Sequence, residues 1–364
     1  MKKVQALFLL MFFSLAYCFA QDKKTFAGYE EYDFIPGEKI IYYEDFVQDT
    51  LEKFPQNWLS NSPGEVLQLK KYPGINWYRM YAGTTNATDG KITFAENTTV
   101  EFDLIANVGE DSTKNIPEIQ IYFHSVLPDQ MLGDYVPGSG GFGIKFNGEN
   151  VGFYSWKNGD YTPVNNEGKT TELIDHKNKK VHMAVSIQKT RVLFYVNQQK
   201  VIDMPDLLPE GIPPLDRITF YSSEANVQST LWVSNLIVST GMPNFRDKLA
   251  KMGKFSSNGI KFESGSDKIR PESYAVLKEI ANIINDSRDT KFRITSYTDS
   301  DGDESMNMVF SQSRAEAVKK VLVDVFEVEA KYISTEGKGE ASPLNKNLSC
   351  EDKAMNRRIE ITKL

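Results

Sequence analysis

The chain has 364 residues, with 42 lysine and arginine residues against 49 aspartate and glutamate residues, so its formal net charge is -7 at pH 7. An acidic chain without a basic stripe argues against nucleic acid as the partner. It also argues against binding to anionic lipid headgroups by charge alone. Two cysteines and three histidines leave little material for a disulfide framework or for acid-base chemistry, so stability must come from buried apolar area.

The first twenty residues have the pattern of a secretory signal peptide. Two lysines precede an apolar stretch over residues 6–19, and Ala20 stands before a polar segment. The apolar stretch is too short to span a bilayer. We predict cleavage after Ala20 and residence in the periplasm or on the periplasmic side of the outer membrane. Lipidation of Cys18 is the alternative, which the bulky Tyr17 before it disfavours.

Cleavage after residue 20 would leave 344 residues with a net charge of -9, because the two lysines leave with the signal. Cys350 would then be the only cysteine, so an intramolecular disulfide is impossible. A chain of this length exceeds what one core usually organises. We therefore predict two domains.

Residues 37–241 show a hydrophobic period of two. Apolar residues alternate with polar ones, and clusters rich in glycine and asparagine separate the segments. This pattern is typical of half-buried antiparallel strands. Because no convincing helix interrupts it, we predict an all-β sandwich or jelly roll. The alternating apolar positions include Val100, Phe102, Leu104, Ile119, Ile121, Phe123, Phe142, Ile144, Phe146, Val181, Met183, Val185, Ile187, Val192, Phe194, Val196, Ile218 and Phe220.

A polar, lysine-rich segment at residues 242–257 breaks this pattern, and we interpret it as a linker. Residues 258–364 then alternate between strand and helix periodicity. We predict strands at 259–263 and from Phe292, a helix that opens at Pro271, a second helix, and two closing strands. This order is typical of a small α/β domain with both helices on one face of the sheet.

The change of period coincides with the polar segment. We therefore predict that the two domains fold independently, so that a fragment from about Ser256 to Leu364 unfolds cooperatively.

The C-terminal residues carry an ordered set of motifs. They are Tyr297-Thr298-Asp299-Ser300-Asp301-Gly302, then Asn307, Phe310-Ser311, Arg314-Ala315, Gly337-Lys338-Gly339-Glu340, Pro343 and Asn356-Arg357-Arg358-Ile359-Glu360. The set closely resembles the OmpA-like peptidoglycan-binding domain over roughly residues 259–364. Two departures are visible, since Tyr297 stands where the family usually has histidine and Phe310 replaces leucine.

The resemblance implies non-covalent binding of the stem peptide of peptidoglycan. Asp299 would receive the ammonium group of diaminopimelate, and Arg314 would hold its carboxylate. Asn307 and one of the two arginines, Arg357 or Arg358, would support the same pocket. Residue chemistry agrees, because a zwitterionic end needs one anion and one planar, bidentate cation. Spacing alone does not separate this role from a structural salt bridge.

Asp299, Asp301 and Asp303 also alternate like the start of a calcium loop. Such a loop needs glycine at its sixth position and glutamate at its twelfth. Glu304 and Phe310 occupy these positions. We therefore predict neither a metal nor a cofactor.

The N-terminal region has a pattern of strands and aromatic residues. The segments that carry it are Tyr43-Glu44-Asp45-Phe46, Phe54-Pro55-Gln56-Asn57-Trp58, Leu193-Phe194-Tyr195-Val196-Asn197 and Val233-Ser234-Asn235-Leu236-Ile237-Val238. This pattern resembles concanavalin-like jelly rolls, which include lectins, laminin-G modules and some glycosidases, and a fold does not determine a function. The glycosidase motif E-x-D-x-x-E fails, because Ala106 stands where the second glutamate belongs. We therefore predict no enzyme, with Glu101 and Asp103 on the solvated face of a strand and His182 on the surface.

Four aromatic residues beside glycine- and asparagine-rich turns are candidates for stacking on sugars: Trp77, Tyr78, Tyr154 and Trp156. The alternative is core packing, where most large aromatic residues go.

We predict a non-enzymatic envelope protein that binds peptidoglycan and presents a β-sandwich to a glycan or an envelope protein. The alternative function is a carbohydrate-recognising or glycan-processing outer-surface protein that the C-terminal domain anchors to the cell wall.

Overall fold

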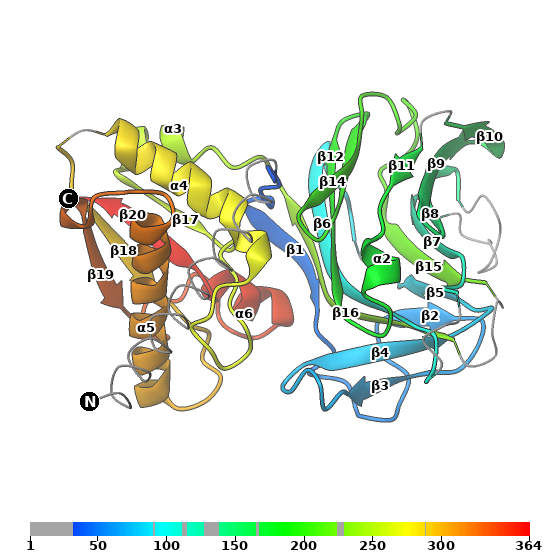
Figure 1. The fold of residues 1–364 in the computed structure, drawn as a ribbon, viewed down its shortest axis with the longest axis horizontal. Coiled ribbons are helices and arrows are strands. Elements are labelled where there is room, and N and C mark those ends of the chain that lie inside the picture. Colours follow the sequence, from blue (N-terminus) through cyan, green and yellow to red (C-terminus); the bar gives the residue numbers. More distant parts are fainter. Residues whose placement is uncertain are drawn as a thin grey trace, which may run out of the picture.

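The computed structural model describes residues 32–89, 92–110, 115–126, 138–164, 167–223, 229–287 and 289–364. The predicted signal peptide, with Cys18, lies outside the described residues. Figure 1 shows a β-rich body beside a smaller body of helices and strands. Among the described residues, none of the helices is both long enough and apolar enough to cross a membrane.

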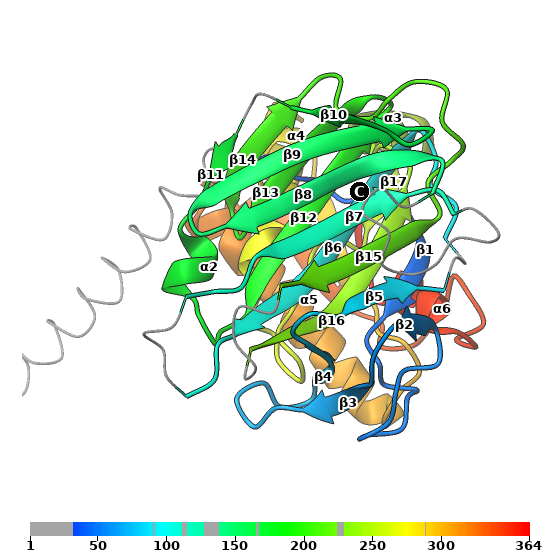
Figure 2. The same cartoon turned by 90° about the vertical axis from the view of Figure 1, so that its right-hand side faces the viewer.

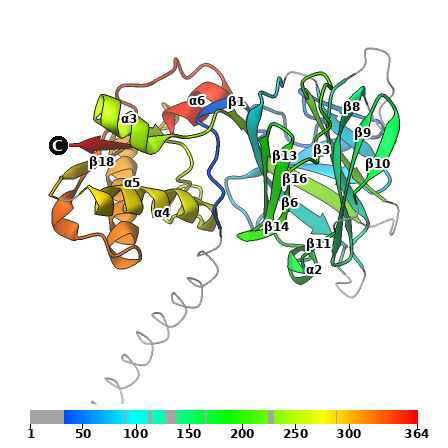
Figure 3. The same cartoon turned by 90° about the horizontal axis from the view of Figure 1, so that it is seen from above.

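The first sheet of the β-rich body, here called the domain-facing sheet, lies next to the smaller body (Figures 1 and 3). It has eight antiparallel strands in the order β14-β13-β12-β6-β16-β4-β3, and β1 pairs with β16. Its strands are β14 (Gln199–Met204), β13 (Arg191–Val196), β12 (Val181–Gln188), β6 (Asn97–Asn107), β16 (Thr230–Thr240), β4 (Asn76–Tyr81), β3 (Gly64–Gln68) and β1 (Lys39–Glu44).

The second sheet, the outer sheet, covers the other side of the sandwich, and Figure 2 shows several of its strands in front of β12, β6 and β16. Its order is β10-β9-β8-β7-β15-β5-β2, and β11 pairs with β9. The strands are β10 (Asp160–Pro163), β9 (Asn150–Lys157), β8 (Gly140–Asn147), β7 (Ile119–His124), β15 (Arg217–Ser222), β5 (Thr85–Thr88), β2 (Trp58–Ser60) and β11 (Gly168–Lys169).

One apolar core fills the space between the two sheets. Val100, Phe102 and Leu104 of β6 enter it together with inward residues of the outer sheet such as Phe123 and Phe142. Side chains that alternate along a strand point to opposite faces, so the period of two places every second residue in this core. The predicted two-sheet sandwich is confirmed. Among its described residues, the one helix is the short α2 (Glu172–Asp175).

The smaller body is built on a four-stranded sheet in the order β17-β20-β18-β19, in which β18 and β19 are parallel. One apolar core joins helices α4 and α5 to Phe292 and Ile294, which lie on the same face of β18. The predicted α/β class is thereby confirmed. The elements are β17 (Lys254–Ser257), β18 (Phe292–Ser296), β19 (Ile333–Gly337), β20 (Ile359–Lys363), α3 (Phe245–Met252), α4 (Tyr274–Asp286), α5 (Glu304–Asp324), α6 (Cys350–Asn356), and the 3-10 turns at Pro271–Ser273 and Ala330–Tyr332.

Two local predictions differ from the structure. Residues 259–263 form no strand and make only an isolated bridge between Phe262 and Ile269. The edge of the sheet beside β20 is taken instead by β17. The polar segment 242–257 therefore contains regular structure and is not the linker that its composition predicts.

Helix α3 within this segment has clear ends. The Asn244 side chain accepts a hydrogen bond from the Asp247 N–H at 3.0 Å, and Gly253 ends the helix with a φ of 70°. Phe245 stacks on Phe255 of β17 with 4.7 Å between ring centroids. Both side chains, with Leu249, belong to the core of the smaller body. The segment is part of that body.

A fragment that begins at Ser256 should therefore be far less stable than one that begins at Met242. It would lack the buried side chains of Phe245, Leu249 and Phe255, each worth about 1.5–3 kcal/mol of burial. Urea unfolding followed by circular dichroism compares the two fragments. We expect a cooperative transition only for the longer fragment, and equal transitions would contradict this placement of α3 and β17.

The two bodies are joined by buried contacts. Tyr32 and Phe34 lie against Tyr195 of the domain-facing sheet and share an apolar cluster with Ala275 of α4. Strand β1 also contacts α6, where the Tyr43 N–H donates to Glu351 Oε1 at 3.2 Å. The domain-facing sheet is thus covered by the C-terminal body along part of its surface.

Candidate functional site

Asp299 lies just after the end of β18, where the chain turns toward α5. Its Oδ1 accepts a hydrogen bond from the Asp301 N–H at 3.1 Å, and its Oδ2 lies 2.5 Å from Arg357 Nη1. The side chain is largely buried, at 8% exposure for the residue. Because a carboxylate offers about four acceptor positions, these two bonds leave room for a further donor from a ligand.

Asn307 holds the turn that presents Asp299. It lies in the first turns of α5, which begins after Asp303 caps the N–H groups of Ser305 and Met306. The Asn307 amide donates to Asp301 O at 3.1 Å and to Glu340 Oε2 at 2.9 Å. The predicted supporting residue therefore positions the loop.

Arg314 lies on the same helix and points its guanidinium into the site. Its Nε donates to Ser266 O at 3.1 Å, and the guanidinium carbon lies 4.9 Å from the Phe262 ring centroid and 6.0 Å from that of Phe310. Among the described residues this is its one hydrogen bond, so both terminal nitrogens can bind an anion. Phe310, the departure from the family's leucine, thus packs beside this cation.

The two arginines after α6 differ in their surroundings. Arg357 pairs with Asp299, and its guanidinium carbon lies 5.1 Å from the Tyr43 ring centroid. Arg358 is 5% exposed, donates from Nη2 to Ser342 O at 3.0 Å, and lies 3.6 Å from the Tyr297 ring centroid. Both arginines line the opening beside Asp299. Arg357 contacts Asp299 directly, and Arg358 also holds the loop around Ser342.

The electrostatics of this site favour an incoming anion at Arg314. Burial lowers the pKa of Arg314, and the nearby charge of Arg357 lowers it further, while Asp299 acts in the opposite direction. A carboxylate placed against Arg314 would stabilise its charged form, which burial and the neighbouring arginine disfavour. Asp299 and Arg314 thus face one opening, and the ion-pair partner of Asp299 is Arg357. Among the described residues, Asp299 and Arg314 form no ion pair with each other.

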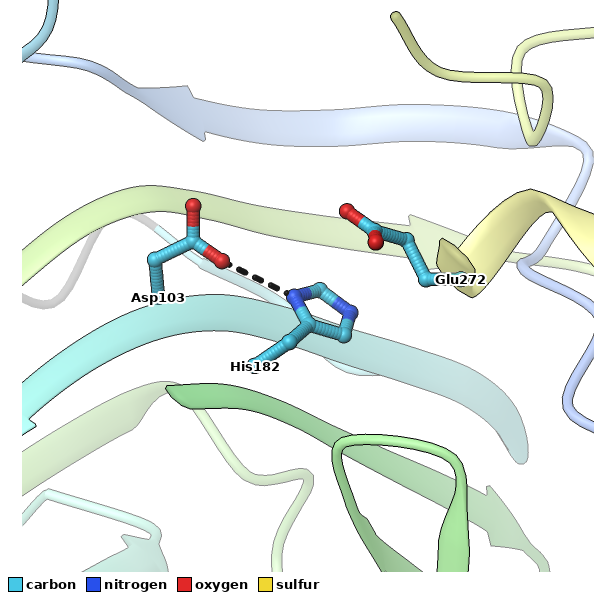
Figure 4. Close-up of side chains that lie close together, drawn as sticks. All are labelled: Asp103, His182 and Glu272. Carbon is cyan, nitrogen blue, oxygen red and sulfur yellow. Dashed lines mark hydrogen bonds and ion pairs between the residues drawn. The ribbon is translucent and has the colours of Figure 1, made fainter. Parts of the chain in front are cut away.

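A second group of charged residues lies buried between the two bodies (Figure 4). Asp103 and Glu101 of β6 are 0% and 3% exposed, and His182 of β12 is 5% exposed. The predicted solvated face of β6 and the predicted surface position of His182 are therefore wrong. The C-terminal body covers that face, so polar residues there are neutralised by partners on the other domain.

The partners of this buried group are cations. Arg270 donates to both oxygens of Asp103 at 2.9 Å, and Lys261 lies 2.5 Å from Glu101 Oε2. Arg270 Nε also lies 2.5 Å from Glu272 Oε1. His182 Nδ1 lies 3.0 Å from Asp103 Oδ1.

Asp103, His182 and Glu272 have ligand atoms within 4.8 Å of one another, a spacing that could hold a metal ion. The bound guanidinium of Arg270 already uses both Asp103 oxygens and lies against Glu272. A metal would have to displace this cation and leave it buried and unpaired, which is costly. The donor set therefore suits an ionic link between domains rather than a metal centre.

This ionic link should weaken in acid. Burial by itself raises the pKa of Glu101, but Lys261 and His182 outweigh it and bring the pKa to about 2, below its ordinary 4.5. A carboxylate with a depressed pKa contributes stability that is present above about pH 4.5 and is lost as the pH falls toward 2.

His182 has the opposite sign. Burial lowers its pKa, yet Glu272, Asp103 and Glu101 raise it overall. The contribution of His182 to folding stability is therefore complete on the acid side and is lost as the pH rises through the raised pKa.

Urea unfolding at intervals from pH 7 to pH 2 tests the acid sensitivity of the link. The urea concentration at the unfolding midpoint should decrease as the pH is lowered below 4.5. Glu101→Gln should flatten that fall, and an unchanged slope would contradict the role of Glu101.

The four aromatic residues predicted to stack on sugars are all buried: Trp77 and Tyr78 at 0% exposure, Tyr154 at 3% and Trp156 at 0%. Tyr78 packs against Trp58 and Phe46 in the core between the sheets. Burial contradicts a stacking role for these side chains, and the alternative of packing holds.

Residues absent from the sequence-based prediction also line the opening at Asp299 and Arg314. Phe262 packs on Arg314, and Tyr43 of the sandwich packs on Arg357. The opening is a cleft of about 600 Å³ that both domains line. The OmpA-like motifs do not include Tyr43, because its proximity to the site arises only when the domains pack.

Comparison with known proteins identifies the family of the C-terminal domain. Residues 261–357 match the model of the OmpA family. The chain is 37% identical over 105 residues to the probable lipoprotein YiaD of Escherichia coli (strain K12), covering 29% of this chain and 48% of YiaD. It is 33% identical over 102 residues to the peptidoglycan-binding protein ArfA of Mycobacterium bovis, covering 28% of this chain and 31% of ArfA. The chain thus spans about half or less of these relatives, and its C-terminal part is an OmpA-like domain.

About half of this chain is similar to a solved structure of the carbohydrate-binding module CBM66 from Bacillus subtilis. The similarity has a TM-score of 0.35 and 14% sequence identity, and covers 52% of this chain and 100% of that one.

Proposed function

We propose that this chain is a non-enzymatic protein of the cell envelope that binds peptidoglycan non-covalently through its OmpA-like domain. The observation that carries the proposal is the open guanidinium of Arg314 beside the partly satisfied carboxylate of Asp299. A relative named for peptidoglycan binding is similar to this chain over 102 residues, and residues 261–357 match the OmpA family. We place the protein in the periplasm or on the periplasmic side of the outer membrane.

The ligand we propose is the diaminopimelate of the stem peptide. The end of its side chain carries an ammonium group and a carboxylate on one carbon, which is the charge pair that Asp299 and Arg314 complement. The ammonium would add its donors to the free acceptor positions of Asp299. The carboxylate would accept from the two terminal nitrogens of Arg314, a bidentate arrangement that gives geometric specificity as well as energy.

Arg357 and Asn307 would act by holding Asp299 in place. Arg357 fixes one carboxylate oxygen, and Asn307 fixes the loop carbonyls around it. A site held by such contacts needs little reorganisation when the ligand arrives, so less of the interaction energy is lost on binding. We further propose that the sandwich is presented to the periplasm once the OmpA-like domain is docked on the wall.

Co-sedimentation with purified sacculi tests the proposal. The protein without its signal peptide should pellet with sacculi that contain diaminopimelate, and soluble stem peptide from the same wall should release it. Sedimentation that soluble stem peptide does not compete away would contradict binding at this site. Failure to sediment would contradict the function as a whole.

A further inference from the structure

The cleft at Asp299 and Arg314 has a second wall that comes from the β-sandwich. Its volume of about 600 Å³ lies within the range of pockets that enclose a drug-sized ligand. The zwitterionic end of one amino acid is smaller than such a ligand, so the cleft has room for more of the molecule. The sandwich side is lined by Tyr43, Asp45, Val47, Asn76, Asn235 and Ile237.

Two of these residues lie on the side of the cleft where Arg357 pairs with Asp299. Tyr43, in β1, faces Arg357, the partner of Asp299, across 5.1 Å. Asp45 follows the end of β1, and its Oδ1 accepts from the Val47 N–H at 3.1 Å. This bond fixes the side chain at the rim of the cleft. Burial raises the pKa of Asp45, while Arg357 and Lys353 oppose that rise, so the carboxylate shares the electrostatic surroundings of the site.

Ion pairs between the two domains hold the second wall in place. The buried pairs of Lys261 with Glu101 and of Arg270 with Asp103 cross from one domain to the other, and Asp103, His182 and Arg270 line the deep part of the same cleft. Separating the domains would break these charge-assisted pairs and would expose the apolar cluster of Tyr32, Phe34 and Ala275 to water. The sandwich wall therefore stays opposite Asp299 when a ligand enters.

From this geometry we propose that strand β1 of the sandwich is part of the ligand site, and that Tyr43 and Asp45 contact the stem-peptide residues that adjoin diaminopimelate. The proposal rests on the function proposed above and extends it. The backbone N–H groups of a peptide can donate hydrogen bonds to the Asp45 carboxylate. Its small apolar side chains can pack against the Tyr43 ring. The full chain then distinguishes a stem peptide from the free amino acid, with the sandwich supplying the additional contacts.

Calorimetric titration of the full chain without its signal peptide tests the proposal with two probes, free diaminopimelate and a stem tetrapeptide that contains it. The wild-type protein should bind the tetrapeptide more tightly. Asp45→Asn keeps the shape of the side chain and removes its charge, so it should fold. We expect the ratio of the two affinities to fall about tenfold in Asp45→Asn and in Tyr43→Ala. Asp160→Asn, an exposed carboxylate on the edge strand β10, is the matched control and should keep the wild-type ratio.

The outcomes separate the two proposals. Wild-type affinity ratios in Asp45→Asn and Tyr43→Ala would overturn the role of β1 and leave the proposed function in place. If the wild-type protein binds neither free diaminopimelate nor the tetrapeptide, the proposed function is overturned, and the role of β1 with it.

Discussion

Arg314→Ala should abolish retention on diaminopimelate-containing peptidoglycan while the protein stays folded. Loss of one partner of a buried charge pair with the ligand costs roughly 2–5 kcal/mol, which is at least a tenfold fall in affinity, since about 1.4 kcal/mol is one decade. Arg314 makes no ion pair among the described residues, and its one hydrogen bond goes to Ser266 O. Its removal therefore strands no buried carboxylate.

Asp299→Ala should lose binding to the same degree, but it should also lower the thermal midpoint, because it leaves Arg357 without its ion-pair partner. Arg314→Lys should bind weakly, since a point charge does not reproduce the planar fork. Arg293→Ala in the same domain, which breaks an exposed pair with Glu336, is the control and should bind like wild type. Retained binding in Arg314→Ala, with lowered stability instead, would assign Arg314 to structure and remove it from the site.

Arg270→Ala should be the most destabilising single change at the domain interface. Arg270 holds both oxygens of Asp103 and lies against Glu272, and all three side chains are largely or wholly buried. Removing one partner of a buried pair costs about 3–5 kcal/mol, because the remaining charge stays in a low-dielectric environment. Urea unfolding followed by tryptophan fluorescence gives the change in the free energy of unfolding.

The matched control is Arg246→Ala. Arg246 pairs with Glu279 and Asp286, but its side chain is 50% exposed, and exposed pairs contribute about 0–1 kcal/mol. A loss in Arg270→Ala no larger than the loss in Arg246→Ala would contradict the buried ionic link between the domains.

The apolar half of the sandwich could be predicted from the sequence, whereas the role of its polar half could not. The alternation along β6 marks Val100 and Phe102 as inward, and the structure buries them. The same alternation assigns Glu101 and Asp103 to solvent, because a period of two reports only that one face is more polar. It carries no information on whether water or a second domain covers that face, and here a domain with complementary charges does.

The polar segment 242–257 was misassigned for a related reason. Helix α3 is short and places only Phe245 and Leu249, one turn apart, in the core. Its other residues are mostly charged or polar, so two apolar positions are too few to reveal a helical period. Its stability comes from packing on β17, which depends on tertiary structure.

For the candidate site, family resemblance supplied the residues, and the structure supplied their pairing. Motif spacing identifies Asp299, Asn307 and Arg314 but contains no distances between side chains. That Asp299 takes Arg357 as its ion-pair partner, leaving Arg314 open, depends on where α6 ends. The contribution of Tyr43 depends on domain packing and has no local signal.

The most direct test of the central claim is the affinity of the full chain, without its signal peptide, for two soluble stem peptides that differ only at the third residue. One carries diaminopimelate, and the other carries lysine, which keeps the ammonium group and lacks the carboxylate. If Asp299 and Arg314 clamp the zwitterionic end, the lysine peptide leaves Arg314 unpaired and should bind at least tenfold more weakly. Equal affinity for the two peptides would contradict the clamp.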